Sequence, residues 1–283
     1  MKIKLTTIGR GVRGGALARL GVWGVLLGAA LLWSCSNSND GAFNFPVGIA
    51  VDSAGKIYVA DEGNNRIVRM DDITGMNLIA LSANPANTAD QLRGPLGVAV
   101  DGNNPPKIYV ADTGNNRIVR FDDMNGANWT SFTGPTSPAD SFFSPAGIAV
   151  KADDSEIYVA DEGHNRIVQM DDLSGNSSSW HPYGIVGTET GSFQAPNGIA
   201  VDSGGKIYVA DYGNNRIVQL DDLTGNPGTW HELGSPGSGI NQFNGPAGIA
   251  VKADGSKIDV SDGLNNRIIQ MDNINGDHWT SYP

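Results

Sequence analysis

The stretch VADEGNNRIVRMDD, residues 59–72, indicates the fold because the chain repeats it. VADTGNNRIVRFDD follows at 110, VADEGHNRIVQMDD at 159, VADYGNNRIVQLDD at 209 and VSDGLNNRIIQMDN at 260. A single copy, with its acidic residues, two asparagines and an arginine, reads like a small active site. A catalytic group is needed once, whereas a fold made of copies needs its framework residues in every copy. The stretch therefore indicates architecture rather than chemistry.

Each copy belongs to a longer unit of four short strands. The units begin near residues 46, 95, 145, 196 and 246, at prolines spaced 49, 50, 51 and 50 residues apart. Their first three strands read GIAVD, KIYVAD and RIVRM, and the fourth carries a tryptophan in every unit but the first. A period of about 40–50 residues is typical of propeller blades. We predict an all-β fold, a β-propeller of five blades, each a four-stranded antiparallel sheet.

The unit PxGIAVDxxGxIYVADxGNNRIV resembles the NHL repeat, and its five copies cover residues 45–283. The resemblance implies a propeller for which six blades are the usual number, whereas this sequence supplies five. The first unit starts with its inner strand and the last ends on its outer strand, so we expect no strand exchange where the ring closes. We expect a closed, monomeric ring in which apolar residues of the first and last blades pack together.

Residues 1–34 predict a signal peptide, because basic residues and no acidic ones accompany the apolar run LGVWGVLLGAALLWS. The only cysteine, Cys35, ends the sequence LLWSC, which resembles a bacterial lipobox, whose cysteine is lipidated after cleavage. A chance cysteine after an ordinary signal is the alternative, but it would leave an orphan thiol in an exported chain. We expect a lipidated Cys35 and a flexible tether over residues 35–44.

The charge balance limits the possible partners. Five of the 19 basic residues lie before Cys35, while all 30 acidic residues lie after it. So acidic a chain repels phosphate backbones, and we expect no nucleic-acid partner. A lipid anchor would place the protein in the cell envelope. Ser36 after the cysteine implies, by family resemblance, the outer membrane or the periplasmic side if the host has two membranes.

Every unit also contains an aspartate followed five residues later by an arginine. The pairs could form a ring of metal or phosphate ligands, or charge-assisted clamps that hold each turn. Presence in all five units favours the structural clamp: Asp61 and Arg66, Asp112 and Arg117, Asp161 and Arg166, Asp211 and Arg216, Asp262 and Arg267. The histidines lack zinc-ligand spacing and the DD turns lack the pattern of calcium loops. We predict no metal, no cofactor and no catalytic residue.

Function is expected where the copies differ. The turn between the second and third strands opens on the same face as the variable connections between blades, and loops on a rigid scaffold commonly carry binding residues. Residues at positions of this turn that vary between units, and one polar residue on an inner strand, are the candidates for the binding face: Glu62, Thr113, Glu162, His164, Asn197 and Tyr212.

These observations predict a non-catalytic, membrane-anchored extracytoplasmic propeller that binds or scaffolds a protein, peptide or glycan. An alternative is an enzyme, because propellers that resemble this one include lyases and lactonases with a metal at the channel mouth. Calcium or zinc would then be held by residues such as Glu62, Glu162, His164 and Asn197. A further alternative is a structural or sensing component of an envelope assembly.

Overall fold

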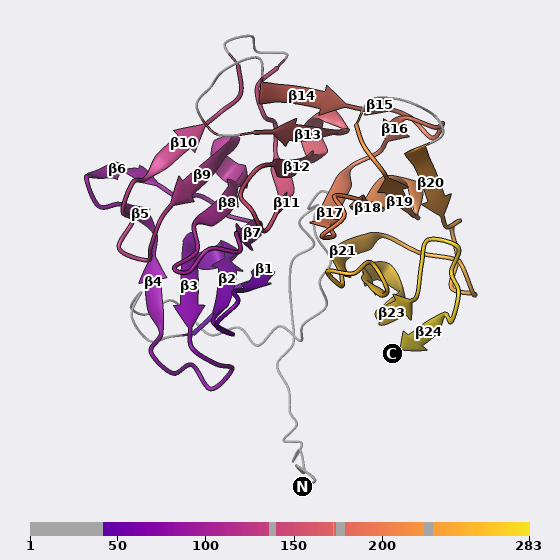
Figure 1. Cartoon of the computed structure of the whole chain (residues 1–283), viewed down its shortest axis with the longest axis horizontal. Helices are drawn as coiled ribbons and strands as arrows, with labels where there is room; N and C mark the ends of the chain where they lie inside the picture. The colour runs from indigo at the N-terminus through magenta and orange to yellow at the C-terminus, as the bar shows by residue number, and fades with distance from the viewer. Residues whose placement is uncertain (1–41, 136–139, 172, 174–178, 224–228) are drawn as a thin grey trace, which may run out of the picture.

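The computed structural model describes residues 42–135, 140–171, 173, 179–223 and 229–283. Five four-stranded antiparallel sheets, here called blades 1 to 5, stand around a common centre with their first strands innermost (Figure 1). Blade 1 contains β1 (Pro46–Val51), β2 (Ile57–Asp61), β3 (Arg66–Met70) and β4 (Ile79–Leu81); blade 2 contains β7 (Gly97–Val100), β8 (Ile108–Asp112), β9 (Arg117–Phe121) and β10 (Thr130–Phe132); blade 3 contains β11 (Pro145–Val150), β12 (Ile157–Asp161), β13 (Arg166–Met170) and β14 (Trp180–Tyr183); blade 4 contains β17 (Pro196–Val201), β18 (Ile207–Asp211), β19 (Arg216–Leu220) and β20 (Trp230–Leu233); blade 5 contains β21 (Pro246–Val251), β22 (Ile258–Asp262), β23 (Arg267–Met271) and β24 (Thr280–Tyr282).

The predicted all-β fold with five blades is confirmed, and each blade is built from one sequence unit without strand exchange. Two short sheets lie in the connections, β5 (Ala83–Asn84) with β6 (Asn87–Gln91), and β15 (Ile185–Val186) with β16 (Ser192–Phe193). A 3₁₀ turn joins the second and third strands of every blade: Glu62–Asn64, Thr113–Asn115, Glu162–His164, Tyr212–Asn214 and Gly263–Asn265.

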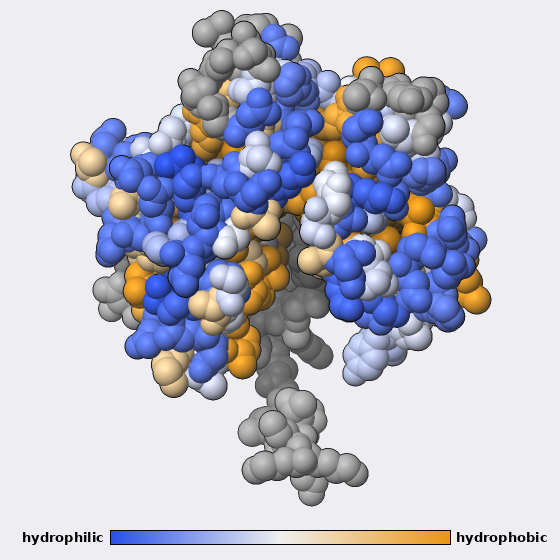
Figure 2. All heavy atoms as spheres, viewed as in Figure 1, coloured by the Kyte–Doolittle hydropathy of each residue, from blue (hydrophilic) through white to orange (hydrophobic). Residues whose placement is uncertain are grey.

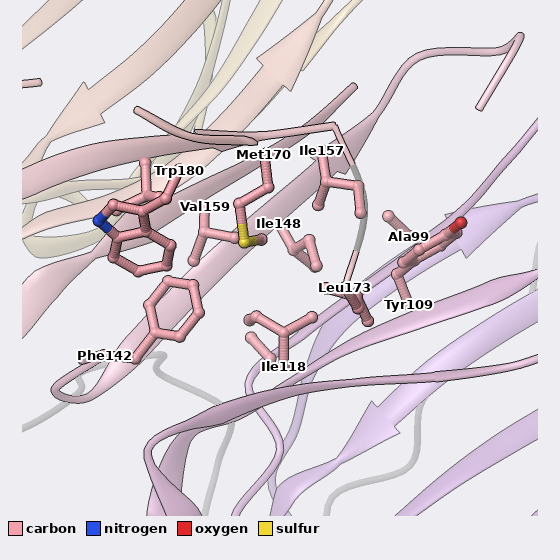
Figure 3. Packing of buried hydrophobic residues seen from close by; sticks show 12 residues of the cluster. Ala99, Tyr109, Ile118, Phe142, Ile148, Ile157, Val159, Met170, Leu173 and Trp180 are labelled. Atoms are coloured by element: carbon pink, nitrogen blue, oxygen red, sulfur yellow. The ribbon is translucent and has the colours of Figure 1, made fainter. Parts of the chain in front are cut away.

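The core lies between the blades, because the second and third strands are apolar on both faces. At the junction of blades 2 and 3, Tyr109 and Ile118 of blade 2 pack with Ile148 and Val159 of blade 3 (Figure 3). Ala111 of blade 2 belongs to the same buried cluster. The same tyrosine, alanine and isoleucine face the next blade at the other three junctions. Each blade thus presents one kind of surface to the blade before it and another to the blade after it.

An inner-strand glycine lets neighbouring blades approach closely. A Cβ added to Gly48, Gly97, Gly147 or Gly198 would lie 2.3–2.4 Å from a backbone carbonyl oxygen of the next inner strand. No side chain fits at that distance, which explains the glycine of the GIAVD strand. The inner strands consequently pack in chain order, from β1 on β7 to β17 on β21.

The expected apolar closure of the ring was wrong for the part of the chain that the structure describes. Gly248 lies against Ser261 of its own blade rather than against a carbonyl of blade 1. Ile268 is 49% exposed, although its equivalents in blades 1 to 4 are 0% exposed, and Ile49 on blade 1 is 65% exposed. Figure 1 shows the ribbon open between β1 and β21. The physical reason lies on the face of blade 5 that points away from blade 4. Asp259 and Ser261 stand there in the positions that carry tyrosine and alanine in the other blades.

The predicted signal peptide, Cys35 and most of the tether lie outside the described residues. In the described portion, no helix has the length and apolar character needed to cross a bilayer.

Candidate binding face

The 3₁₀ turns share one face of the propeller with the connections that lead into each blade. An asparagine, the last residue of GNN or of its variants GHN and LNN, ends each turn in the left-handed conformation, with φ between 53° and 55°. Asparagine tolerates this conformation better than other non-glycine residues. The GNN sequence therefore forms a reproducible corner on which single-copy residues are displayed.

Each Asp–Arg pair ties its turn to the connection that enters the same blade. In blade 4, Asp211 accepts hydrogen bonds from Arg216 Nε at 2.8 Å, Asn214 Nδ2 at 2.8 Å and Gln194 N at 2.8 Å. Arg216 also donates to the carbonyl of Ser192. The four other pairs make the same Nε to Oδ2 contact at 2.6–2.8 Å. All five aspartates are fully buried, so these carboxylates act within the framework and not toward a ligand.

A second contact, here called the blade latch, joins each turn to the connection of the next blade. The side-chain oxygen of the turn asparagine accepts a hydrogen bond of 2.7–2.8 Å from a backbone N–H just before the next proline. The four latches join Asn65 to Gly94, Asn116 to Ser144, Asn165 to Ala195 and Asn215 to Gly245. The sequence pattern indicated only a turn here, and the latch depends on contacts about 30 residues away.

Buried aromatic residues anchor the variable connections. Phe142, Phe193 and Phe243 pack against the tryptophans of the blades they enter, with ring centroids 4.9–5.2 Å apart. The clamp arginines lie over the same tryptophans, as Arg216 does at 5.3 Å from Trp230. Each connection is therefore fixed at its end even where its sequence varies. The aromatic residue shared by these connections is the sequence feature from which this anchoring role could have been predicted.

Three of the candidate residues come together in one hollow. Glu62, Thr113 and Glu162 belong to blades 1, 2 and 3 and line an open hollow of about 520 Å³ with Arg93 and Leu96. The Thr113 hydroxyl donates to the carbonyl of Pro145 at 2.6 Å, so its oxygen can still accept a hydrogen bond. The hollow is thus lined by two glutamates, a threonine and Arg93, which the repeat does not require.

Burial changes the acidity of both glutamates in this hollow. Desolvation raises the pKa of Glu162 to about 7 and raises the pKa of Glu62 as well. Loss of water around a carboxylate penalises its charged form, and no hydrogen bond to either carboxylate is described. A cation placed beside Glu162 would favour the charged form of its carboxylate.

The other three candidates lie elsewhere on the face. His164 replaces the first turn asparagine, and its Nδ1 lies 3.0 Å from Asp161 Oδ2. Tyr212 is half-buried, and its ring lies against Gly245. Asn197 occupies on β17 the position of Leu96, which lines the hollow over blades 1 to 3. Among the described residues, no group of three His, Cys, Asp or Glu side chains converges to hold a metal ion.

Comparison with known proteins agrees with this architecture. The NHL repeat model matches residues 43–70, 92–121 and 193–220. The chain thus contains NHL repeats and folds as a β-propeller of five blades. In sequence, it is 31% identical over 98 residues to the chloroplastic protein SUPPRESSOR OF QUENCHING 1 of Arabidopsis thaliana, an alignment covering 31% of this chain and only 9% of that relative.

Solved structures share the fold at low sequence identity. A nidogen–laminin complex matches with a TM-score of 0.63 at 20% identity, covering 84% of this chain and 79% of the other. Catalytically inactive virginiamycin B lyase from Staphylococcus aureus, with quinupristin, matches at 0.59 and 19%, covering 87% and 72%. A streptogramin B lyase matches at 0.57 and 19%, covering 84% and 68%. The matched proteins include both an enzyme and a protein in a complex, so the fold alone does not choose a function.

Proposed function

We propose that this propeller is a binding module of the cell envelope that holds a cationic segment of a protein or peptide, or a polyhydroxylated glycan, over blades 1 to 3. The observation that carries the proposal is the convergence of Glu62, Thr113 and Glu162 in one hollow. The residue at this turn position differs among the blades (Glu62, Thr113, Glu162, Tyr212 and Gly263), whereas the clamps and latches beside it recur. Residues that differ on an otherwise repeated scaffold fit a role in recognition.

The chemistry of the hollow supports a cationic or hydroxyl-rich ligand. Two partly desolvated carboxylates would accept hydrogen bonds from an ammonium, a guanidinium or sugar hydroxyls. Because the pKa of Glu162 is about 7, binding of a cation should displace a proton below that pH. Affinity for a cationic group should therefore rise as the pH increases from 6 to 8.

The proposal is tested with lysine- or arginine-containing peptides and a panel of neutral glycans as probes. Glu162→Gln should weaken binding of a responsive peptide about tenfold, equivalent to ~1.4 kcal/mol, and should abolish its pH dependence. Glu189→Gln, which changes an exposed glutamate of a connection, is the matched control. Equal binding by the wild type and the Glu162→Gln variant would contradict the site. Turnover of a probe, instead of binding alone, would favour the enzyme alternative.

We also propose that Cys35 anchors the chain to a membrane through lipid and that the protein works as a monomer. The basis is the signal-type segment with its single thiol, and the acidic composition disfavours a nucleic-acid partner. Mass spectrometry of the protein purified from its native membrane should find a lipidated Cys35 as the first residue. Detection of residues 1–34, or of an unmodified cysteine, would contradict the anchor.

A further inference from the structure

The inner strand of blade 1 has an apolar surface that no preceding blade covers. Its three outward-facing residues, here called the first wall, are Val47, Ile49 and Val51, which are 37%, 65% and 58% exposed. The residues equivalent to Ile49 in blades 2, 3 and 4 are each 6% exposed: Val98, Ile148 and Ile199. Figure 2 shows apolar surface on the side of blade 1 that faces the open gap. Exposed apolar surface of this kind is typical of an interaction site.

Blade 1 also has the backbone conformation that a latch requires. Phe45 has φ of 50°, an uncommon conformation for a bulky residue. The equivalent residues Gly94, Ser144, Ala195 and Gly245 have φ of 49–61°, and there each backbone N–H donates to the asparagine of the preceding blade. Within the described residues, no such asparagine is bonded to Phe45. The backbone N–H of Phe45 is therefore in the conformation of a latch donor, although no preceding blade in the described part of the chain supplies the acceptor.

The surface at the other end of the array does not match the first wall. In blade 5, Asp259 and Ser261 replace the tyrosine and alanine that face the next blade everywhere else. Asp259 accepts from Gln270 Nε2 at 2.8 Å, and Ser261 Oγ accepts from Gly248 N at 2.7 Å. Contact between this surface and the first wall would bury a carboxylate against aliphatic side chains, which is strongly unfavourable. The same objection applies to blade 5 of a second copy.

We propose that the first wall is a docking surface for a β-sheet of a different protein, which stacks on blade 1 as a preceding blade would. The four internal junctions define the chemistry of that sheet. Its face should carry an aromatic, a small and a β-branched residue in the places of Tyr58, Ala60 and Ile67. A side-chain amide oxygen should lie within reach of Phe45 N. This surface is separate from the hollow over blades 1 to 3, so either proposal can fail alone.

A tethered blade tests the complementarity of the wall. In the full chain, a second copy of residues 46–90 inserted directly before Ala42 reproduces the register in which blade 1 precedes blade 2. We expect the melting temperature to rise by at least about 5 °C and β1 amide hydrogens to exchange at least about tenfold more slowly. The matched control carries Tyr58→Asp and Ala60→Ser in the inserted copy only, and should show neither effect.

Equal gains from both insertions would overturn the proposal, because they would show no preference for the predicted chemistry. Protection of β1 amides in the unaltered, purified chain to the level of β7 would also overturn it, since the ring would then close on itself. In source cells, a photo-crosslinking residue at position 49 should capture a β-sheet segment of another polypeptide whose outward face is apolar. Crosslinks confined to lipid, to blade 5 or to a second copy would contradict the assignment.

Discussion

At the scale of single residues, adjacent positions on the same turn have different roles. Asp211 is enclosed by three hydrogen bonds and belongs to the framework, whereas Tyr212 is half-buried beside it. The repeated pattern allowed the framework role of the aspartates to be predicted from the sequence. The convergence of Glu62, Thr113 and Glu162 could not be predicted, because it depends on how three blades are oriented around the ring.

Replacement of Asp211 by alanine should lower the free energy of unfolding by about 3 kcal/mol, because it removes the acceptor shared by Arg216 Nε, Asn214 Nδ2 and Gln194 N, while Glu232 still pairs with Arg216. Tyr212→Ala should lower it by only about 1 kcal/mol, through lost packing against Gly245. Chemical denaturation of both variants measures the difference. Similar losses for the two variants would show that Tyr212 is part of the framework as well.

The raised pKa of Glu162 predicts a stability that depends on pH. Between the ordinary glutamate pKa of about 4.5 and the folded pKa of about 7, the folded chain holds a proton that the unfolded chain has released. Stability contributed by this residue therefore falls as the pH rises through that window, by about 1–3 kcal/mol. Glu162→Gln should be the more stable protein at pH 8 and should lose this dependence, while Glu189→Gln should retain it. Denaturation between pH 5 and pH 8 checks the sign.

At the scale of elements, the connections were the part that sequence patterns described least well. Their lengths and sequences vary, yet a latch and a buried side chain fix the end of each one; the side chain is aromatic in three connections and is Leu92 in the connection into blade 2. The strands were predicted because their apolar residues repeat with the units. The latch was missed because asparagine is also the ordinary residue for a left-handed turn, so the conformational explanation appeared sufficient.

A comparison of two equivalent asparagines, Asn215 and Asn266, separates the contribution of the latch to stability from that of the turn. Glycine at either position keeps the left-handed conformation and removes only the side chain. Asn215→Gly should lower the free energy of unfolding by about 0.5–1.5 kcal/mol, because Gly245 N loses its acceptor. Asn266→Gly, at the end of blade 5, should change it by less than about 0.5 kcal/mol. Thermal unfolding of the pair measures the latch, and equal effects would assign the asparagine to the turn alone.

At the scale of the whole molecule, the number and phase of the blades could be predicted, but the opening between the first and last could not. Repeated units imply equivalent junctions between blades. They do not give the angle between neighbouring blades, which determines whether five blades complete a circle. The available signal was the change from KIYVAD to KIDVSD in the last unit, which makes the outer surface of blade 5 polar. Terminal repeats of open arrays commonly carry such a polar surface.

An open array has ends, and its end blades should respond to force differently from the blades between them. Blade 1 is held to the rest of the propeller through one junction, whereas each of blades 2 to 4 is held through two. Tension applied at the N-terminus should therefore peel blade 1 away first and leave the remaining blades folded. In an optical trap, this would appear as an extension of about one repeat unit, near 50 residues, before the main rupture. A single rupture of the whole chain would instead indicate that the five blades yield together.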